Sequence, residues 1–196
     1  MKTQLLKLKE KNDLKVTEDT QFVLDFSKLN KEGQYEINLF LEKEGVEAEL
    51  LGLYKIGKEN SLKLITSAQH KVPHTKCTTI VRGVLLDGGK SDYIGKIIIE
   101  KPAQQTSSYL DDSVLVVGED THNNSQPILE IEADDVKASH GATTGRVDDM
   151  QVYYLKSRGF NELEAKNLIV EGFLRATLSR IQDEKVRSKV SVTLGL

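Results

Sequence analysis

Residues 129–146, with the sequence LEIEADDVKASHGATTGR, mark the point at which the chain changes character. Before this segment, short runs rich in Val, Ile and Leu alternate with turn residues, which is typical of β-strands. After it, apolar residues take the spacing of amphipathic helices. The sequence therefore predicts a mainly β protein, with a β-rich core over residues 1–146 and a small α-helical region over residues 147–196.

The arrangement of the predicted strands is not fixed by their pattern alone. Strands are predicted at residues 22–26, 35–40, 62–66, 78–81, 97–99, 114–117 and 128–131. No residue pattern recurs among them at a constant spacing, so a sandwich, a barrel and a solenoid all fit. Residues 1–20, which are rich in lysine, are expected to form a flexible or helical lead-in to this core.

Capping residues define two helices after Arg146. Asp148 is expected to cap the first helix, and Gly159 is expected to end it. Asn161 is expected to cap the second, with Glu164 at the capping-box position.

The second helix carries apolar stripes on two opposite sides, although a helix that covers one face of a sheet needs only one. One stripe consists of Ala165, Leu168, Ile169, Phe173 and Ala176. The other consists of Leu163, Val170, Leu174, Leu178 and Ile181. Either a three-helix bundle closed by residues 183–192 covers the second stripe, or another protein does. We predict that the second stripe contacts a partner.

Composition excludes several classes of function. The net charge of −3 and the absence of a basic cluster argue against nucleic-acid binding. The single cysteine, Cys77, excludes an internal disulfide. No apolar run is long enough to span a membrane and no signal peptide is recognisable, so a cytoplasmic location without membrane contact is expected.

Residues 129–146, together with DDMQVYYLKSRGF at residues 148–160 and the pairs Glu164-Ala165 and Gly172-Phe173, resemble the C-terminal core of the SufB/SufD family. The residues that precede SHGAT (residues 139–143) are more similar to SufD than to SufB. The resemblance implies a short right-handed parallel β-helix followed by helices. It also implies a non-catalytic scaffold for iron–sulfur cluster assembly. Such a scaffold pairs through its β-helix with itself or with a SufB/SufD relative. Its C-terminal helices bind a SufC-like ABC ATPase, in which ATP hydrolysis takes place.

Two residues are candidate metal ligands. His140 lies among small residues, and the family has a histidine at this position; a neutral imidazole suits iron. Cys77 is the one thiol, so a transient cluster would have to be shared at a subunit interface, with His140 or with carboxylates such as Glu130 or Glu132. The alternatives are a hydrogen-bonded interface histidine and a small buried cysteine.

Other chemistries fit the sequence less well. Residues 141–145 lack the Gly-Lys-Ser/Thr ending of a phosphate loop, so no nucleotide is expected on this chain. A hydrolase built on Ser139, His140 and Asp134 or Asp135 is disfavoured, because adjacent residues of a strand point to opposite faces. The alternative function is that of a β-solenoid binding module that has lost cluster assembly.

Overall fold

The computed structural model describes residues 1–58 and 60–196. Strands fill the first three quarters of the chain, and three helices follow them. The strands are β1 (Lys2–Lys7), β2 (Lys11–Val16), β3 (Thr20–Asp25), β4 (Glu32–Leu41), β5 (Glu47–Ile56), β6 (Ser61–His70), β7 (Lys76–Leu85), β8 (Lys90–Ile99), β9 (Thr106–Val116), β10 (His122–Ile131) and β11 (Val136–Arg146).

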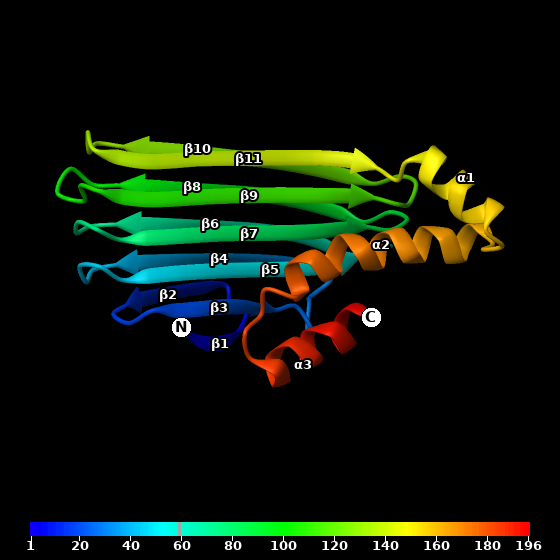
Figure 1. Ribbon diagram of the computed structural model, residues 1–196, viewed down its shortest axis with the longest axis horizontal. Helices are drawn as coiled ribbons and strands as arrows, with labels where there is room; N and C mark the ends of the chain where they lie inside the picture. Colours follow the sequence, from blue (N-terminus) through cyan, green and yellow to red (C-terminus); the bar gives the residue numbers. More distant parts are fainter. Residues whose placement is uncertain (59) are drawn as a thin grey trace.

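Consecutive strands alternate between two parallel sheets. The six-stranded sheet has the order β1-β3-β5-β7-β9-β11, and the five-stranded sheet has the order β10-β8-β6-β4-β2. The chain therefore winds as a solenoid, in which each turn adds one strand to each sheet (Figure 1). The expectation of a parallel β-helix followed by a helical region is confirmed.

The turns of the solenoid differ in length, which explains why no repeat is visible in the sequence. Ser61 lies opposite Glu32, an offset of 29 residues. Thr20 lies opposite Lys2, an offset of only 18, and His122 lies opposite Lys90, an offset of 32. Because connecting loops absorb these differences, the strands stay in register while the period varies.

The first strands correct the expectation for residues 1–20. This segment forms β1 and β2, which pair with β3 and β4, and is neither helical nor a flexible lead-in. Leu6 and Val16 are buried in the solenoid interior. Their burial stabilises the strands, because an amphipathic strand at the end of a sheet still covers one face of the core.

Two apolar cores lie on opposite sides of the six-stranded sheet. The interior of the solenoid holds alternate residues such as Leu50, Tyr54 and Ile56. The residues between them, Leu51 and Leu53, face outward into a second core that the C-terminal helices complete. β5 is therefore covered on both faces, and the helices are part of the same packed structure as the solenoid.

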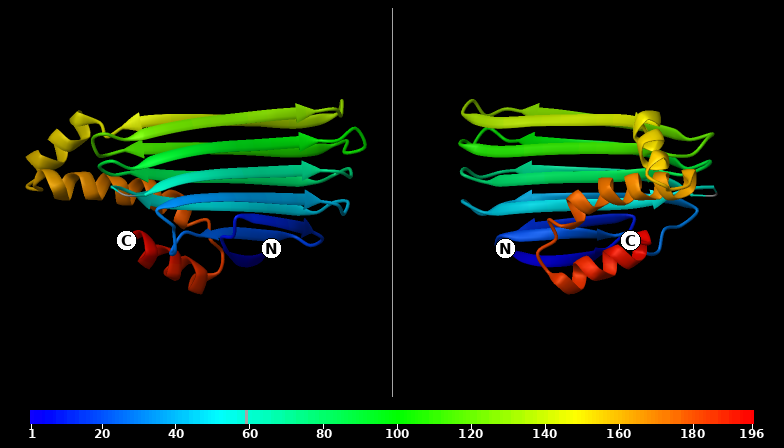
Figure 2. Two further views of the ribbon diagram at one scale, coloured as in Figure 1. Left: turned by 180° about the vertical axis from the view of Figure 1, so that it is seen from behind. Right: turned by 45° about the vertical axis from the view of Figure 1, so that its right-hand side comes forward.

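The helices begin and end where the caps place them. They are α1 (Asp149–Ser157), α2 (Glu162–Leu178) and α3 (Glu184–Leu194). Asp148 accepts a hydrogen bond from the Met150 amide, and Asn161 forms the expected capping box with Glu164. Gly159 follows α1 with φ of 100°, a left-handed conformation that glycine adopts without strain. Figures 1 and 2 show α1 beyond the strand ends, α2 returning along the six-stranded sheet, and α3 close to β1 and β3.

Candidate functional site

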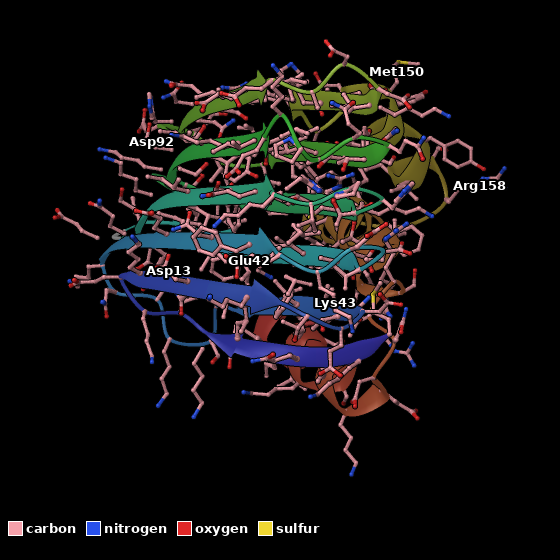
Figure 3. All side chains as sticks on the ribbon, turned by 90° about the vertical axis from the view of Figure 1, so that its left-hand side faces the viewer. Asp13, Glu42, Lys43, Asp92, Met150 and Arg158 are labelled. Atoms are coloured by element: carbon pink, nitrogen blue, oxygen red, sulfur yellow. The ribbon has the colours of Figure 1, made fainter. Side chains whose placement is uncertain are left out.

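An exposed apolar surface covers α1 and the first half of α2. We call it the α1–α2 surface; it consists of Met150, Tyr153, Tyr154, Phe160, Leu163 and Leu168. Met150 is 71% exposed, Tyr153 69% and Leu163 70%. Large apolar side chains seldom gather on a surface that only meets water, and a contiguous patch of them usually marks an interface. Figure 3 shows Met150 and Arg158 on the same side of the molecule.

A hollow of about 460 Å³ lies between the two helices of this surface. It is lined by Met150, Gln151, Tyr154, Leu155, Leu168 and Ile169. Five of these six residues have apolar or aromatic side chains, so the hollow suits an inserted apolar side chain.

Charged side chains border the α1–α2 surface. Lys166 donates a hydrogen bond of 2.8 Å to Glu162, and Lys156 lies 3.5 Å from the same carboxylate. The hydrogen bond from Lys166 holds the pKa of Glu162 below its usual value. The Arg158 guanidinium lies 5.2 Å from the centre of the Tyr154 ring, a cation–π distance. The surface thus has an apolar centre and a charged rim, as many protein interfaces do.

The structure corrects the position of the partner-facing stripe. Val170, Leu174, Leu178 and Ile181 are buried in the second core, against outward-facing residues of β3, β5 and β7. Four of the five predicted residues therefore cover this chain's own sheet, and only Leu163 is exposed. These residues are buried because the outer face of the six-stranded sheet offers them a continuous apolar surface on which to pack.

A polar cluster fixes the end of α2 to the sheet. The Arg180 guanidinium donates two hydrogen bonds to Glu49 Oε1, at 2.8 and 2.6 Å. Gln21, which is fully buried, donates to Glu49 Oε2 at 2.6 Å and to the Arg180 carbonyl at 2.8 Å. The backbone N–H of Gln182 donates a hydrogen bond to Gln21 Oε1 at 2.9 Å. We call this set the α2 anchor.

The solenoid ends at β10 and β11, the last strands of their sheets. We call this the open end. His140 lies opposite Leu110 in register, and Leu110 is buried in the interior, so His140 belongs to the interior face of the last turn. Its neighbour Ser139 lies opposite the exposed Tyr109 and belongs to the outer face. The two side chains diverge, so the hydrolase arrangement lacks its nucleophile–base contact.

Asp112 is a buried acid on the strand that pairs with the strand of His140. It is fully buried on β9, and its Oδ2 accepts a hydrogen bond of 2.6 Å from Ser125 on β10. Its Oδ1 has no hydrogen-bond partner in the described part of the chain. Burial raises the pKa of Asp112 to about 6, because the interior disfavours the charged carboxylate.

Cys77 lies apart from His140. It is buried on β7 opposite Ser108 of β9, so the whole of β9 separates β7 from β11. Burial raises the pKa of the thiol to about 12, so it is protonated at neutral pH and is a poor metal ligand. Glu130 lies opposite Ile98 on the outer face, away from His140, and Glu132 follows the end of β10. No group of three His, Cys, Asp or Glu side chains suited to a metal occurs among the residues that the structure describes.

Two features of the candidate site were not recognised from the sequence. Asp112 occupies an interior position of β9, in which residues alternate between buried and partly exposed. An acidic residue at such an interior position was the signal in the sequence that could have identified it. Met150 and Tyr153 are exposed because α1 extends beyond the solenoid (Figure 1), which the sequence pattern did not indicate. Within residues 1–58 and 60–196, no helix is long and apolar enough to cross a bilayer.

Comparison with known proteins identifies one family. Residues 11–173 match the family model described as "SUF system FeS cluster assembly, SufBD core domain". The chain is 31% identical over 156 residues to the iron–sulfur cluster assembly protein SufD of Escherichia coli; the match covers 72% of this chain and 37% of that protein. It is 33% identical over 161 residues to a SufBD family protein of Mycobacterium leprae, covering 78% of this chain and 41% of that protein. It is 37% identical over 108 residues to SufD of Bacillus subtilis, covering 55% and 25%. The matched region is thus less than half of each of these relatives.

Proposed function

The chain belongs to the SufB/SufD family of SUF-system iron–sulfur cluster assembly proteins, and from this we propose that it is a non-catalytic scaffold subunit of a cluster assembly complex in the cytoplasm. The observation that carries the proposal is the α1–α2 surface. It is the large exposed apolar region of a helical segment whose other apolar stripe is already buried.

The α1–α2 surface is proposed to bind a SufC-like ABC ATPase. Its apolar hollow and charged rim provide the two components of a specific interface: desolvated anchor contacts and orienting charges. The α2 anchor ties the same helix to β3 and β5. A movement of the bound ATPase would therefore pull on the solenoid through a fixed connection, which is the mechanical requirement for a scaffold driven by a partner's hydrolysis.

The open end is proposed to pair with a second β-solenoid, either another copy of this chain or a SufB/SufD relative. The outer edges of β10 and β11 carry backbone N–H and C=O groups that can continue the sheets into a partner. Leu129 and Ile131 lie on the interior face of β10 and are partly exposed at this end. Pairing would bury them and bring the His140 region to the subunit interface, where the iron or cluster cargo is proposed to pass.

Anaerobic co-expression with the SufC-like ATPase of the source organism tests the docking surface. We expect co-elution at a fixed stoichiometry in size-exclusion chromatography with light scattering. Tyr153→Glu and Leu163→Glu should each weaken the complex at least about tenfold, because each places a charge in a desolvated contact. Both residues are exposed, so the variants should fold normally. Leu174→Glu or Leu178→Glu would instead unfold the second core and are unsuitable.

Val192→Glu is the matched control. Val192 is 76% exposed on α3, outside the α1–α2 surface, so this change should leave the complex intact. Equal binding by wild type, Tyr153→Glu and Leu163→Glu would refute the assigned surface. A chain that ignores the ATPase altogether would favour a β-solenoid binding module that has lost cluster assembly.

A further inference from the structure

The last turn of the solenoid, formed by β10 and β11, closes over an acid whose hydrogen bonding is incomplete. Asp112 is fully buried on β9, and Ser125 of β10 donates a hydrogen bond of 2.6 Å to its Oδ2. Its Oδ1 has no hydrogen-bond partner among the described residues. Buried polar atoms are nearly always bonded, so an acid held in this state needs an explanation.

The phenol groups near Asp112 are hydrogen-bonded elsewhere. Burial, together with the nearby charge of Asp112, raises the pKa of Tyr54 and of Tyr93, so both rings lie within electrostatic reach of the acid. Tyr54 donates its proton to Ser91 Oγ, 3.2 Å away, and the Tyr93 hydroxyl lies 2.7 Å from Thr66 Oγ1. The closed interior therefore surrounds Asp112 without giving its Oδ1 a donor.

Asp112 also lacks a counter-ion in the interior. The cation whose charge reaches it, Arg82, lies on the outer face of the sheet and is paired there with Asp111. Burial raises the pKa of Asp112 from 3.8 to about 6, so at neutral pH the interior holds an ionised carboxylate. The charged or titratable groups that surround it are Arg82 of β7, Asp111 of β9, Tyr54 of β5, Tyr93 of β8 and His140 of β11.

The cover over Asp112 is one turn thick. Ala142 of β11 lies opposite Asp112 in register, and Ala142 and His140 are exposed although they belong to the interior face. Leu129, on the interior face of β10, is 36% exposed. β10 and β11 are the last strands of their sheets, at the end of the stack (Figure 1). Movement of these two strands alone would expose Asp112 to water and leave β1 to β9 in place.

We propose that Asp112 is a pH-dependent switch for the last turn: its protonated form keeps β10 and β11 closed, and its ionised form lets them separate from β8 and β9. Opening hydrates the charge, which the closed interior leaves without a donor or a counter-ion. The same strands carry the edges proposed to pair, so the switch would set how readily this end opens. The inference goes beyond the proposed function, because the switch is a property of the chain alone.

The direction of the pH effect follows from the pKa values of the two states. In the open state the hydrated carboxyl has its ordinary pKa of 3.8, whereas in the closed state its pKa is about 6. The closed state therefore holds the proton more tightly, and opening becomes easier as the pH rises from about 4 to about 6. The effect is complete by about pH 7, where the carboxyl is ionised in both states.

Hydrogen exchange of the isolated full chain tests the switch. Exchange is measured by mass spectrometry at about pH 4.5 and at pH 7 and is corrected for the intrinsic rate at each pH. In wild type, protection of β10 and β11 should be at least about tenfold lower at pH 7 than at pH 4.5. His70 acts in the opposite direction, because its burial costs stability in acid, so it cannot produce this result.

Variants assign the effect to one side chain. Asp112→Asn should abolish the pH dependence and raise protection of β10 and β11 at pH 7 at least about tenfold, because it removes the charge and keeps the shape. Glu130→Gln is the matched control: it removes an exposed acid from the outer face of β10 and should behave as wild type. His140→Gln removes the titratable side chain of β11 on the interior face and should also keep the pH dependence.

Three results would overturn the switch. These are protection of β10 and β11 that does not change with pH in wild type, a pH dependence that survives in Asp112→Asn, and one that disappears in His140→Gln. Lower protection of Asp112→Asn than of wild type at pH 7 would also refute it, since the carboxylate would then stabilise the closed turn. Neither the ATPase nor a second solenoid takes part in these measurements, so their outcome leaves the proposed function to its own tests.

Discussion

At the scale of single residues, His70 shows how the interior sets the chemistry of a side chain. Its imidazole is fully buried between Thr75 Oγ1, 2.8 Å from Nδ1, and Ser108 Oγ, 3.0 Å from Nε2. Burial lowers its pKa from 6.5 to about 4, so the ring is neutral at pH 7. A histidine held by two hydroxyl groups is a structural member of the core.

This burial predicts a loss of stability in acid. The unfolded chain takes up a proton at His70 near pH 6.5, whereas the folded chain takes it up only near pH 4. The stabilisation is therefore present above pH 6.5 and is lost as the pH falls toward 4. Between pH 7 and pH 5, His70 should lower the free energy of unfolding by about 2 kcal/mol. Urea unfolding of wild type and His70→Gln at both pH values measures the effect, and equal losses in the two proteins would contradict it.

Candidate residues were easier to identify from the sequence than the contacts that they make in the fold. The sequence places His140 among small neighbours, but the face of the sheet on which its side chain lies depends on the pairing of β11 with β9, thirty residues earlier. Long-range pairing also places Asp112 on a buried position of β9, where its Oδ1 has no hydrogen-bond partner among the residues that the structure describes. Neither fact is encoded in the few residues around the position.

At the scale of elements, the α2 anchor joins a helix to a sheet through a buried acid. The Glu49 side chain is 11% exposed, and its carboxylate accepts hydrogen bonds from Arg180 and Gln21. Removing Arg180 leaves a buried charge with one neutral donor, whereas removing the charge of Glu49 leaves a half-exposed guanidinium that water can reach. Losing Arg180 should therefore cost more free energy of unfolding than losing the charge of Glu49.

Arg180→Ala should lower the free energy of unfolding by about 3 kcal/mol, as expected for an acid left unpaired in a core. Glu49→Gln should cost only about 1 kcal/mol, because the amide keeps hydrogen-bonding capacity. Arg175→Ala is the control: it removes an exposed pair with Glu171 and should cost less than about 0.5 kcal/mol. Chemical denaturation measures all three, and an Arg180→Ala cost below that of Glu49→Gln would refute the assigned asymmetry.

Strands and helices that pack on one face only were easier to predict from the sequence than those that pack on two faces. β4 alternates between buried and more exposed residues over its first half and was predicted at residues 35–40, and so were the caps of α1 and α2. β5 was missed because its residues pack on both faces, which gives the continuous apolar run Leu50 to Tyr54 instead of an alternation. The two stripes of α2 were recognised, but which of them meets the sheet depends on the second core.

At the scale of the whole molecule, the solenoid is a stack in which each turn contacts mainly its neighbours. Family resemblance supplied this architecture, because turn offsets between 18 and 32 residues hide the repeat from the sequence. In such stacks stability is distributed from turn to turn, and the end turns have a neighbour on one side only. The burial pattern agrees: β7 is almost wholly buried, whereas most of β11 is exposed.

Hydrogen exchange should therefore be graded along the stack. Amides of β11 should exchange at least about tenfold faster than those of β7 in the isolated chain, because the last turn can open without disrupting the interior. Exchange measured by mass spectrometry resolves the two strands. If the open end pairs as proposed, assembly should slow exchange in β10 and β11 while β7 stays unchanged, and ATPase binding should protect α1 separately. Uniform exchange across the strands of the free chain would mean that the solenoid opens as one cooperative unit, which would contradict the graded stack.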